Sequence, residues 1–137
     1  MTMTRFQLPT VLSAAAICVA VTGCKDKTED TGTEPTVTYE EVLNDVLIPS
    51  CGFNACHGEG EGFLTIAEGQ TEAEWLTFES SAVPGTMLIE AGSASTSYLV
   101  KKIEGASDIE GDVMPPSGKM DQSRINKVRS WIDNIEE

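Results

Sequence analysis

Two cysteines and the only histidine of the chain lie close together, at Cys51, Cys56 and His57. A cysteine followed directly by a histidine, with a second cysteine shortly upstream, is the attachment pattern of c-type haem. Each thiol adds to a haem vinyl group, and a neutral imidazole is a good ligand for iron. Four residues separate the cysteines here, whereas the usual pattern has two. Gly52 and Asn54 tolerate positive φ, so the extra residues can bulge outward.

Two other uses of these side chains are a structural disulfide and a zinc site. A disulfide between Cys51 and Cys56 explains neither the adjacent His57 nor the methionine-proline loop at Met114. Zinc takes four ligands in structural sites, and two cysteines with one histidine leave the fourth position open. The pattern therefore favours haem, with a disulfide as the alternative.

The first 23 residues predict an export signal, because Arg5 is followed by a mostly apolar stretch that is too short to span a bilayer comfortably. The stretch ends in Gly23-Cys24, which resembles the bacterial lipobox, where cleavage leaves a lipid-bearing cysteine. An ordinary cleaved signal is the alternative. Residues 24–36 then predict a lipidated N-terminus and a polar tether. Lys25 stands where inner-membrane lipoproteins commonly have aspartate, so the outer membrane is favoured over the inner one.

Charge is distributed unevenly along the chain, whose formal net charge is −13. Between Lys27 and Lys101 there is no lysine or arginine, against thirteen acidic residues. This distribution excludes nucleic-acid binding, because contacts to phosphate need lysine and arginine. An acidic surface serves solubility, and it can also attract a partner with a basic docking surface.

Residues 37–137 predict one small all-α domain of three to five short helices. Capping boxes at Thr38 and Thr71 each precede an apolar pattern of helical spacing. The first of these helices is expected to end at Pro49. Two more helices are expected, one beginning near Ser95 or Thr96 and one beginning at Asp121 or Ser123; strand signals are weak.

The ordered set of motifs resembles the class I cytochromes c, especially the small cytochrome c domains of bacterial lipoproteins. The resemblance runs from about Thr36 to Ile135 and is carried by Pro49-Ser50-Cys51, Cys56-His57-Gly58, Ser97 to Lys102, Met114-Pro115-Pro116 with Gly118, and Trp131-Ile132. It implies a mono-haem electron carrier in which the helices pack around one covalent haem c. It further implies that the protein is not an enzyme and that it exchanges electrons with redox proteins outside the cytoplasm.

The resemblance also implies a role for each matched residue. Cys51 and Cys56 would form the thioethers, His57 would be the proximal iron ligand, and Met114 the distal ligand. Met87, expected in the core, and Met120, expected at the edge of the last helix, are the rival ligands. The first and last helices would cross near the haem, with Val46 or Leu47 against Trp131 or Val128.

Two other functions stay open at this point. One is a haem-free surface lipoprotein that acts as an interaction module and contains a Cys51–Cys56 disulfide. The other is a haem-based ligand sensor with an open distal site.

Overall fold

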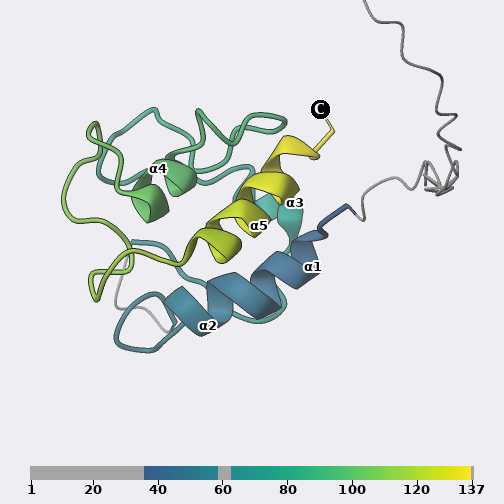
Figure 1. Cartoon of the computed structure of the whole chain (residues 1–137), viewed down its shortest axis with the longest axis horizontal. Helices are drawn as coiled ribbons and strands as arrows, with labels where there is room; N and C mark the ends of the chain where they lie inside the picture. The colour runs from purple at the N-terminus through teal and green to yellow at the C-terminus, as the bar shows by residue number, and fades with distance from the viewer. Residues whose placement is uncertain (1–35, 59–62, 137) are drawn as a thin grey trace, which may run out of the picture. The chain divides into compact units, whose positions relative to one another are not determined.

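The computed structural model describes residues 36–58 and 63–136, in which the regular secondary structure is helical (Figure 1). Within these ranges there is no strand, only an isolated antiparallel bridge between Glu79 and Met87. The all-α expectation is confirmed at this level. The expected signal peptide, the lipid-bearing Cys24 and nearly all of the tether lie outside the described residues.

The first helix is continuous from Tyr39 to Cys51 and has three parts: α1 (Tyr39–Val42), the π-helical turn η1 (Leu43–Leu47) and α2 (Ile48–Cys51). The predicted capping box at its start is confirmed. The Thr38 side chain accepts the Glu41 N–H at 3.2 Å, and the Glu41 carboxylate accepts the Thr38 N–H at 2.8 Å. These two bonds satisfy backbone donors that the first turn leaves unpaired.

The expectation that Pro49 ends this helix is wrong. The helix widens into a π turn before the proline, and the Ile48 N–H donates to the Leu43 carbonyl five residues back. Pro49 then falls in the first turn of α2, where a missing N–H and a fixed φ are tolerated. The helix ends at Gly52 instead, whose N–H donates to the Leu47 and Ile48 carbonyls at 3.2 and 2.9 Å. Cys51 is therefore the last helical residue.

Three shorter elements follow: α3 (Glu72–Trp75), α4 (Tyr98–Glu104) and α5 (Gln122–Asp133). The predicted capping box at Thr71 is confirmed, and α5 begins at the expected place, with Asp121 as its cap. α4 begins later than Ser95 or Thr96, because the N–H groups of Tyr98 and Leu99 donate to the carbonyls of Met87 and Leu88. These two hydrogen bonds give the first N–H donors of α4 partners outside the helix, and they fix where α4 starts.

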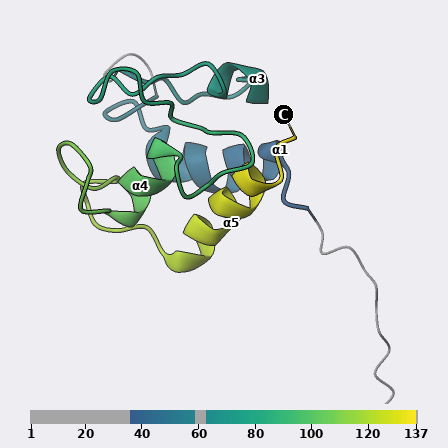
Figure 2. The same ribbon diagram turned by 90° about the horizontal axis from the view of Figure 1, so that it is seen from above.

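The first helix and α5 pack together with opposite chain directions (Figures 1 and 2). Tyr39 stacks on Trp131 with ring centroids 5.4 Å apart, and Lys127 pairs with Asp45 at 2.5 Å. Arg124 donates to Ser50 at 3.2 Å near the other end of the pair. The aromatic partner of Trp131 is thus Tyr39, which the resemblance had not placed there.

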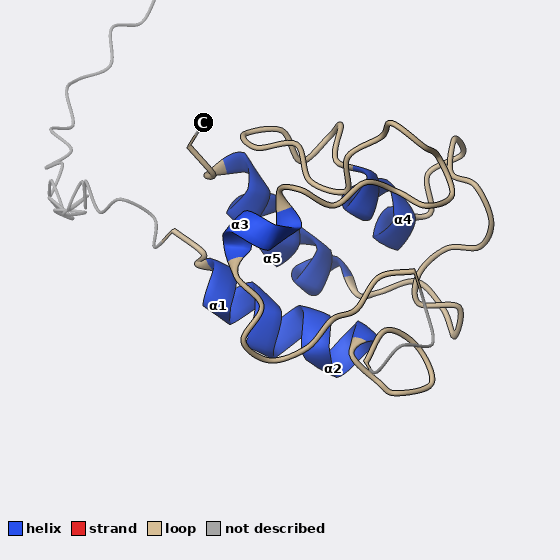
Figure 3. Cartoon of the chain, turned by 180° about the vertical axis from the view of Figure 1, so that it is seen from behind, coloured by secondary structure: helices blue, strands red, loops and turns tan. Residues whose placement is uncertain are grey.

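A single buried core joins these elements, and loops make up much of the chain between them (Figure 3). The buried side chains of the first helix, α4 and α5 include Val42, Leu47, Ile103, Ile125 and Ile132. No helix among residues 36–58 and 63–136 is long and apolar enough to cross a membrane.

Candidate haem-binding site

The loop from Cys51 to Gly58 is closed by its own backbone hydrogen bonds. The His57 N–H donates to the Cys51 carbonyl at 3.1 Å, so the two ends of the loop meet. Inside it, the Phe53 carbonyl accepts the N–H groups of Cys56 and Gly58 at 2.8 and 2.9 Å. The four residues between the cysteines therefore form a compact hydrogen-bonded turn that brings Cys51, Cys56 and His57 into one loop.

Glycine is required in this loop for space. Gly52 tolerates positive φ but does not use it here, since its φ is −77°. A Cβ atom on Gly52 would lie 2.9 Å from the Ile48 carbonyl oxygen and 3.1 Å from the Ile66 carbonyl oxygen. A Cβ atom on Gly58 would lie 2.7 Å from the Gly52 carbonyl oxygen. The enlarged loop is thus accommodated by close backbone packing at two glycines.

The ring of His57 is held by a main-chain oxygen. Nδ1 lies 3.0 Å from the Leu64 carbonyl oxygen. A carbonyl oxygen only accepts hydrogen bonds, so Nδ1 carries the proton and the neutral ring has its lone pair on Nε2. Histidines that bind metals generally donate the other ring N–H to a carbonyl or carboxylate in this way. The main chain of His57 is held by the same segment, because its carbonyl accepts the Ile66 N–H at 2.5 Å.

The two cysteines differ in environment, although they share the loop. Cys51 is buried at the end of α2 and Cys56 is exposed, and both are free thiols in the described structure. Burial, together with a smaller effect of the neighbouring Cys56, raises the pKa of Cys51 to about 11. Cys51 is therefore a neutral thiol at physiological pH, which fits a residue that ends as an uncharged thioether.

Met114 lies on a different loop from the cysteines. It is half-buried, and its N–H donates to the Lys102 carbonyl of α4 at 2.9 Å. Met87 is also half-buried and not part of the core, contrary to expectation. Met120 lies at the edge of the last helix, as expected, directly before the Asp121 cap of α5, and its side chain is buried in the core at 6 % exposure.

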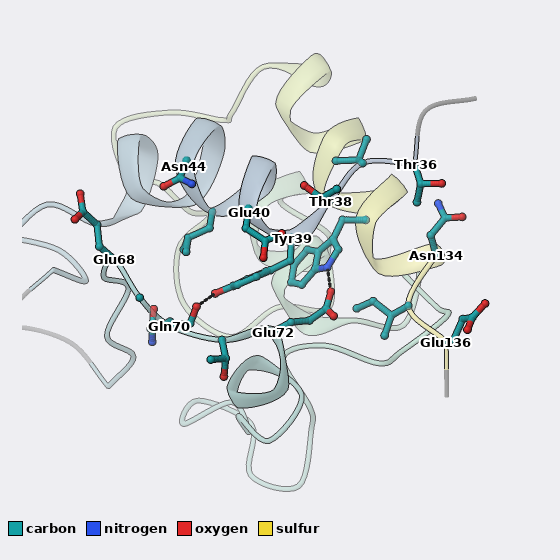
Figure 4. A pocket seen from close by; sticks show the side chains of 16 residues that line it. Thr36, Thr38, Tyr39, Glu40, Asn44, Glu68, Gln70, Glu72, Asn134 and Glu136 are labelled. Carbon is teal, nitrogen blue, oxygen red and sulfur yellow. Dashed lines mark hydrogen bonds between the residues drawn. The ribbon is translucent and has the colours of Figure 1, made fainter. Parts of the chain in front are cut away.

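The larger of the two surface hollows described lies elsewhere (Figure 4). It has a volume of about 880 Å³ and opens beside the start of α1, with Tyr39, Glu72 and Trp131 in its wall. The Trp131 indole donates to Glu72 at 2.5 Å, and the Tyr39 hydroxyl donates to the Gln70 carbonyl at 3.0 Å. Cys51 is at the opposite end of the first helix, a length of roughly 18–20 Å at 1.5 Å per residue. The hollow is therefore separate from the cysteine loop.

The residues present fit a covalent haem in type and arrangement. Two thiols and an imidazole share a short loop, and the imidazole has its Nδ1 occupied and Nε2 available. Within residues 36–58 and 63–136, no three histidine, cysteine, aspartate or glutamate side chains gather to hold a metal ion. Comparison with known protein families, curated protein sequences and solved structures gives no match for this chain.

Two contributors to the site were missed by sequence reasoning. The Leu64 carbonyl has no sequence signal, since any residue can supply a main-chain oxygen. Lys102 stands in the segment Ser97 to Lys102 that carries the resemblance, but the motif alone assigns it no role. Its contacts to the Met114 loop are visible only in the structure.

Proposed function

We propose that this protein is a mono-haem c-type cytochrome that carries single electrons outside the cytoplasm. The observation that carries the proposal is the setting of His57, the only histidine of the chain. It directly follows Cys56, and its Nδ1 is held by the Leu64 carbonyl, which leaves Nε2 for iron. The proposed fold is accordingly a small class I cytochrome c domain.

In this proposal the chain holds the haem through four side chains. Cys51 and Cys56 form the thioethers, His57 is the proximal ligand and Met114 the distal ligand. The bound haem supplies reversible one-electron chemistry, while the protein supplies ligation and orientation. The Leu64 carbonyl fixes the tautomer and the ring orientation of His57. The hydrogen bonds of residues 51–58 fix the cysteines relative to that ring.

The proposed location is a bacterial membrane surface facing the periplasm or the exterior, with the outer membrane favoured. A lipid on Cys24 would anchor the chain, and residues 24–36 would let the domain move between redox partners. The proposal predicts that Cys24→Ser moves the full-length protein from the membrane fraction to the soluble fraction. Retention of this variant in the membrane fraction would argue against the lipid anchor.

A haem-free interaction module is the second candidate. It is favoured by one observation, namely that Cys56 is near enough to Cys51 to raise the pKa of its thiol. Two neighbouring thiols in an oxidising compartment can also form a disulfide. In that case His57 and Met114 would have no role in cofactor binding.

The deciding experiment is to express the full chain together with haem-attachment machinery. We expect a c-type reduced-minus-oxidised spectrum and one haem mass linked to the peptide that contains Cys51 and Cys56. His57→Ala is the matched variant, since it keeps both cysteines and removes the proposed ligand. A two-proton loss between the cysteines, without haem mass, would instead establish the disulfide. Carbon monoxide binding to the reduced native protein would indicate an open distal site.

A further inference from the structure

One face of α4 contacts the loop that carries Met114. Tyr98, Lys101, Lys102 and Gly105 are spaced i, i+3, i+4 and i+7, so they lie on the same side of the helix. The remaining apolar residues, which include Val100 and Ile103, belong to the buried core. In Figure 2 the chain leaves α4 and forms a long loop before it enters α5.

The Lys102 side chain is bound to the main chain of this loop. Its ammonium donates to the carbonyl oxygens of Glu110 and Asp112 at 2.9 and 2.5 Å. The neighbouring Tyr98 hydroxyl accepts the Glu110 N–H at 3.0 Å. Two carbonyls separated by a single residue therefore converge on one positive charge, and charge-assisted hydrogen bonds of this kind are stronger than neutral ones.

Lys102 also holds Met114 through its own main chain. Its carbonyl oxygen accepts the Met114 N–H at 2.9 Å. Between these contacts, Val113 lies over Gly105, where a Cβ atom would come within 3.2 Å of the valine side chain. The loop is thus attached to α4 at residues 110, 112 and 114, and Lys102 makes a bond at each of these points.

The adjacent Lys101 differs in the kind of contact it makes. It forms a salt bridge of 2.7 Å with Asp108, whose side chain is 59 % exposed. An exposed ion pair contributes little, because water screens it and both side chains lose freedom. Lys101 is therefore a matched control for Lys102, with the same side chain, the same helix and a contact to the same loop.

We propose that Lys102 is a positioning residue for Met114. It acts by keeping residues 110–114 on α4, so that the methionine stays where it can ligate iron. The inference rests on the proposed function, because a thioether is a weak ligand that stays bound only if its loop is held. The structural part of the inference, that Lys102 limits opening of this loop, does not require haem.

The test is a comparison of the Lys102→Met and Lys101→Met variants of the full-length protein. Lys102→Met keeps most of the side-chain volume and removes the donor. A hydrogen bond that water can also reach contributes about 0.5–1.5 kcal/mol, which corresponds to roughly two- to tenfold more frequent loop opening. We expect amide hydrogen exchange at Glu110 and Met114 to rise by that factor, and the methionine–iron charge-transfer band to weaken.

Lys101→Met should leave both readouts close to those of the wild type. Lys102→Arg should restore the band in large part, because a guanidinium can also donate to both carbonyls. Unchanged exchange at Met114 in Lys102→Met would overturn the inference, and so would faster exchange with an intact charge-transfer band. If Lys102→Met does not fold, Tyr98→Phe tests the same attachment through faster exchange at Glu110.

Failure of the proposed function would have a different signature. If the wild-type protein carries no covalent haem, neither it nor any variant shows a charge-transfer band. Hydrogen exchange at Met114 still compares Lys102→Met with Lys101→Met in that protein. Equal exchange in the two variants would then overturn the role of Lys102 independently.

Discussion

At the scale of the residue, the chemistry of His57 is set by one hydrogen bond. An imidazole that is free to rotate presents either nitrogen to a ligand and loses rotational freedom on binding. The Leu64 carbonyl selects the Nδ1–H tautomer and fixes the plane of the ring. The half-buried ring of His57 is thereby held in one orientation, as the proposed iron ligand requires.

The first prediction concerns Gly58, where a side chain has no room. In Gly58→Ala the new Cβ would meet three backbone atoms within 2.9 Å, belonging to Gly52, Phe53 and Asn54. Backbone atoms cannot swing away as a flexible side chain can, so we expect a loss of about 1–3 kcal/mol in the free energy of unfolding. Urea unfolding followed by circular dichroism measures this loss. Ala55→Ser, at an exposed position of the same loop, is the control, and a Gly58→Ala midpoint equal to that control contradicts the prediction.

The second prediction separates Met114 from its rivals. If Met114 is the distal ligand, Met114→Ala removes the methionine–iron charge-transfer band and lowers the reduction potential, because methionine ligation raises it. Met87→Ala and Met120→Leu keep both properties; leucine conserves most of the volume at the buried Met120. Absorbance of the oxidised protein and a redox titration are the measurements. A band that persists in Met114→Ala and disappears in one of the other variants assigns the ligand elsewhere.

Residue types and adjacency were sufficient to predict Cys51, Cys56 and His57 as one group. The role of each glycine was not predictable in the same way. Glycine allows a positive φ, and it also allows two backbone segments to approach closely, and a sequence does not distinguish these uses. At Gly52 the structure requires close approach. The burial of Met120 had no signal for a related reason, since one residue between a loop and a helix cap gives no periodic pattern.

At the scale of the element, the first helix contributes to the hollow at its start and to the cysteine loop at its end. Its start holds Tyr39 against α5 and the hollow, and its end places Cys51 at the cysteine loop. The capping boxes and the buried face were predictable from local residue order. The π turn was not predictable from the sequence, because a single wider turn leaves the spacing of apolar residues over these five positions almost unchanged. Pro49 therefore suggested that the helix ends there, whereas the helix continues for two more residues, to Cys51.

The third prediction concerns Tyr39, which joins α1 to the segment that leads into α3. Burial raises the pKa of Tyr39 above its usual 10.0, and the carboxylates of Glu74, Glu40 and Glu72 add to the rise. The Trp75 indole opposes it, but this buried Nε1 has no hydrogen-bond partner of good geometry within the described residues, so we expect its effect to be small. As the pH rises, the unfolded chain therefore loses the tyrosine proton before the folded protein does. The stabilisation is complete below pH 10 and is lost as the pH passes through the higher folded value.

The measurement is urea unfolding between about pH 8 and about pH 11, a range that brackets the ordinary tyrosine pKa. We expect the free energy of unfolding of the wild type to fall more steeply over this range than that of Tyr39→Phe. The comparison uses the slope with pH, because Tyr39→Phe also loses the hydrogen bond to Gln70 at every pH. Equal slopes in the two proteins would show that Tyr39 titrates alike in the folded and unfolded states.

At the scale of the whole molecule, several basic residues pair with acidic side chains, and one of these pairs reaches into the segment before Lys101. Lys101, Lys127 and Arg129 form salt bridges with Asp108, Asp45 and Glu104, respectively. The long segment between Lys27 and Lys101 has no lysine or arginine of its own, so most of its acidic charge is left to act on solvent and partners. Such a field acts on encounter rates more than on the stability of the fold.

The last prediction follows from this field and from the proposed electron transfer. The haem-loaded protein should exchange electrons faster with a small cationic redox reagent than with an anionic reagent of similar driving force. At low ionic strength we expect a difference of roughly tenfold or more, since electrostatic steering changes association rates by about 10–10³-fold. Salt should shrink the difference, because the screening length is only about 10 Å at 0.1 M ionic strength. Stopped-flow absorbance at several salt concentrations measures both rates. Equal rates with the two reagents at low salt, or a faster anionic reagent, would mean that the acidic charge does not reach the site of electron exchange, and would leave solubility as its role.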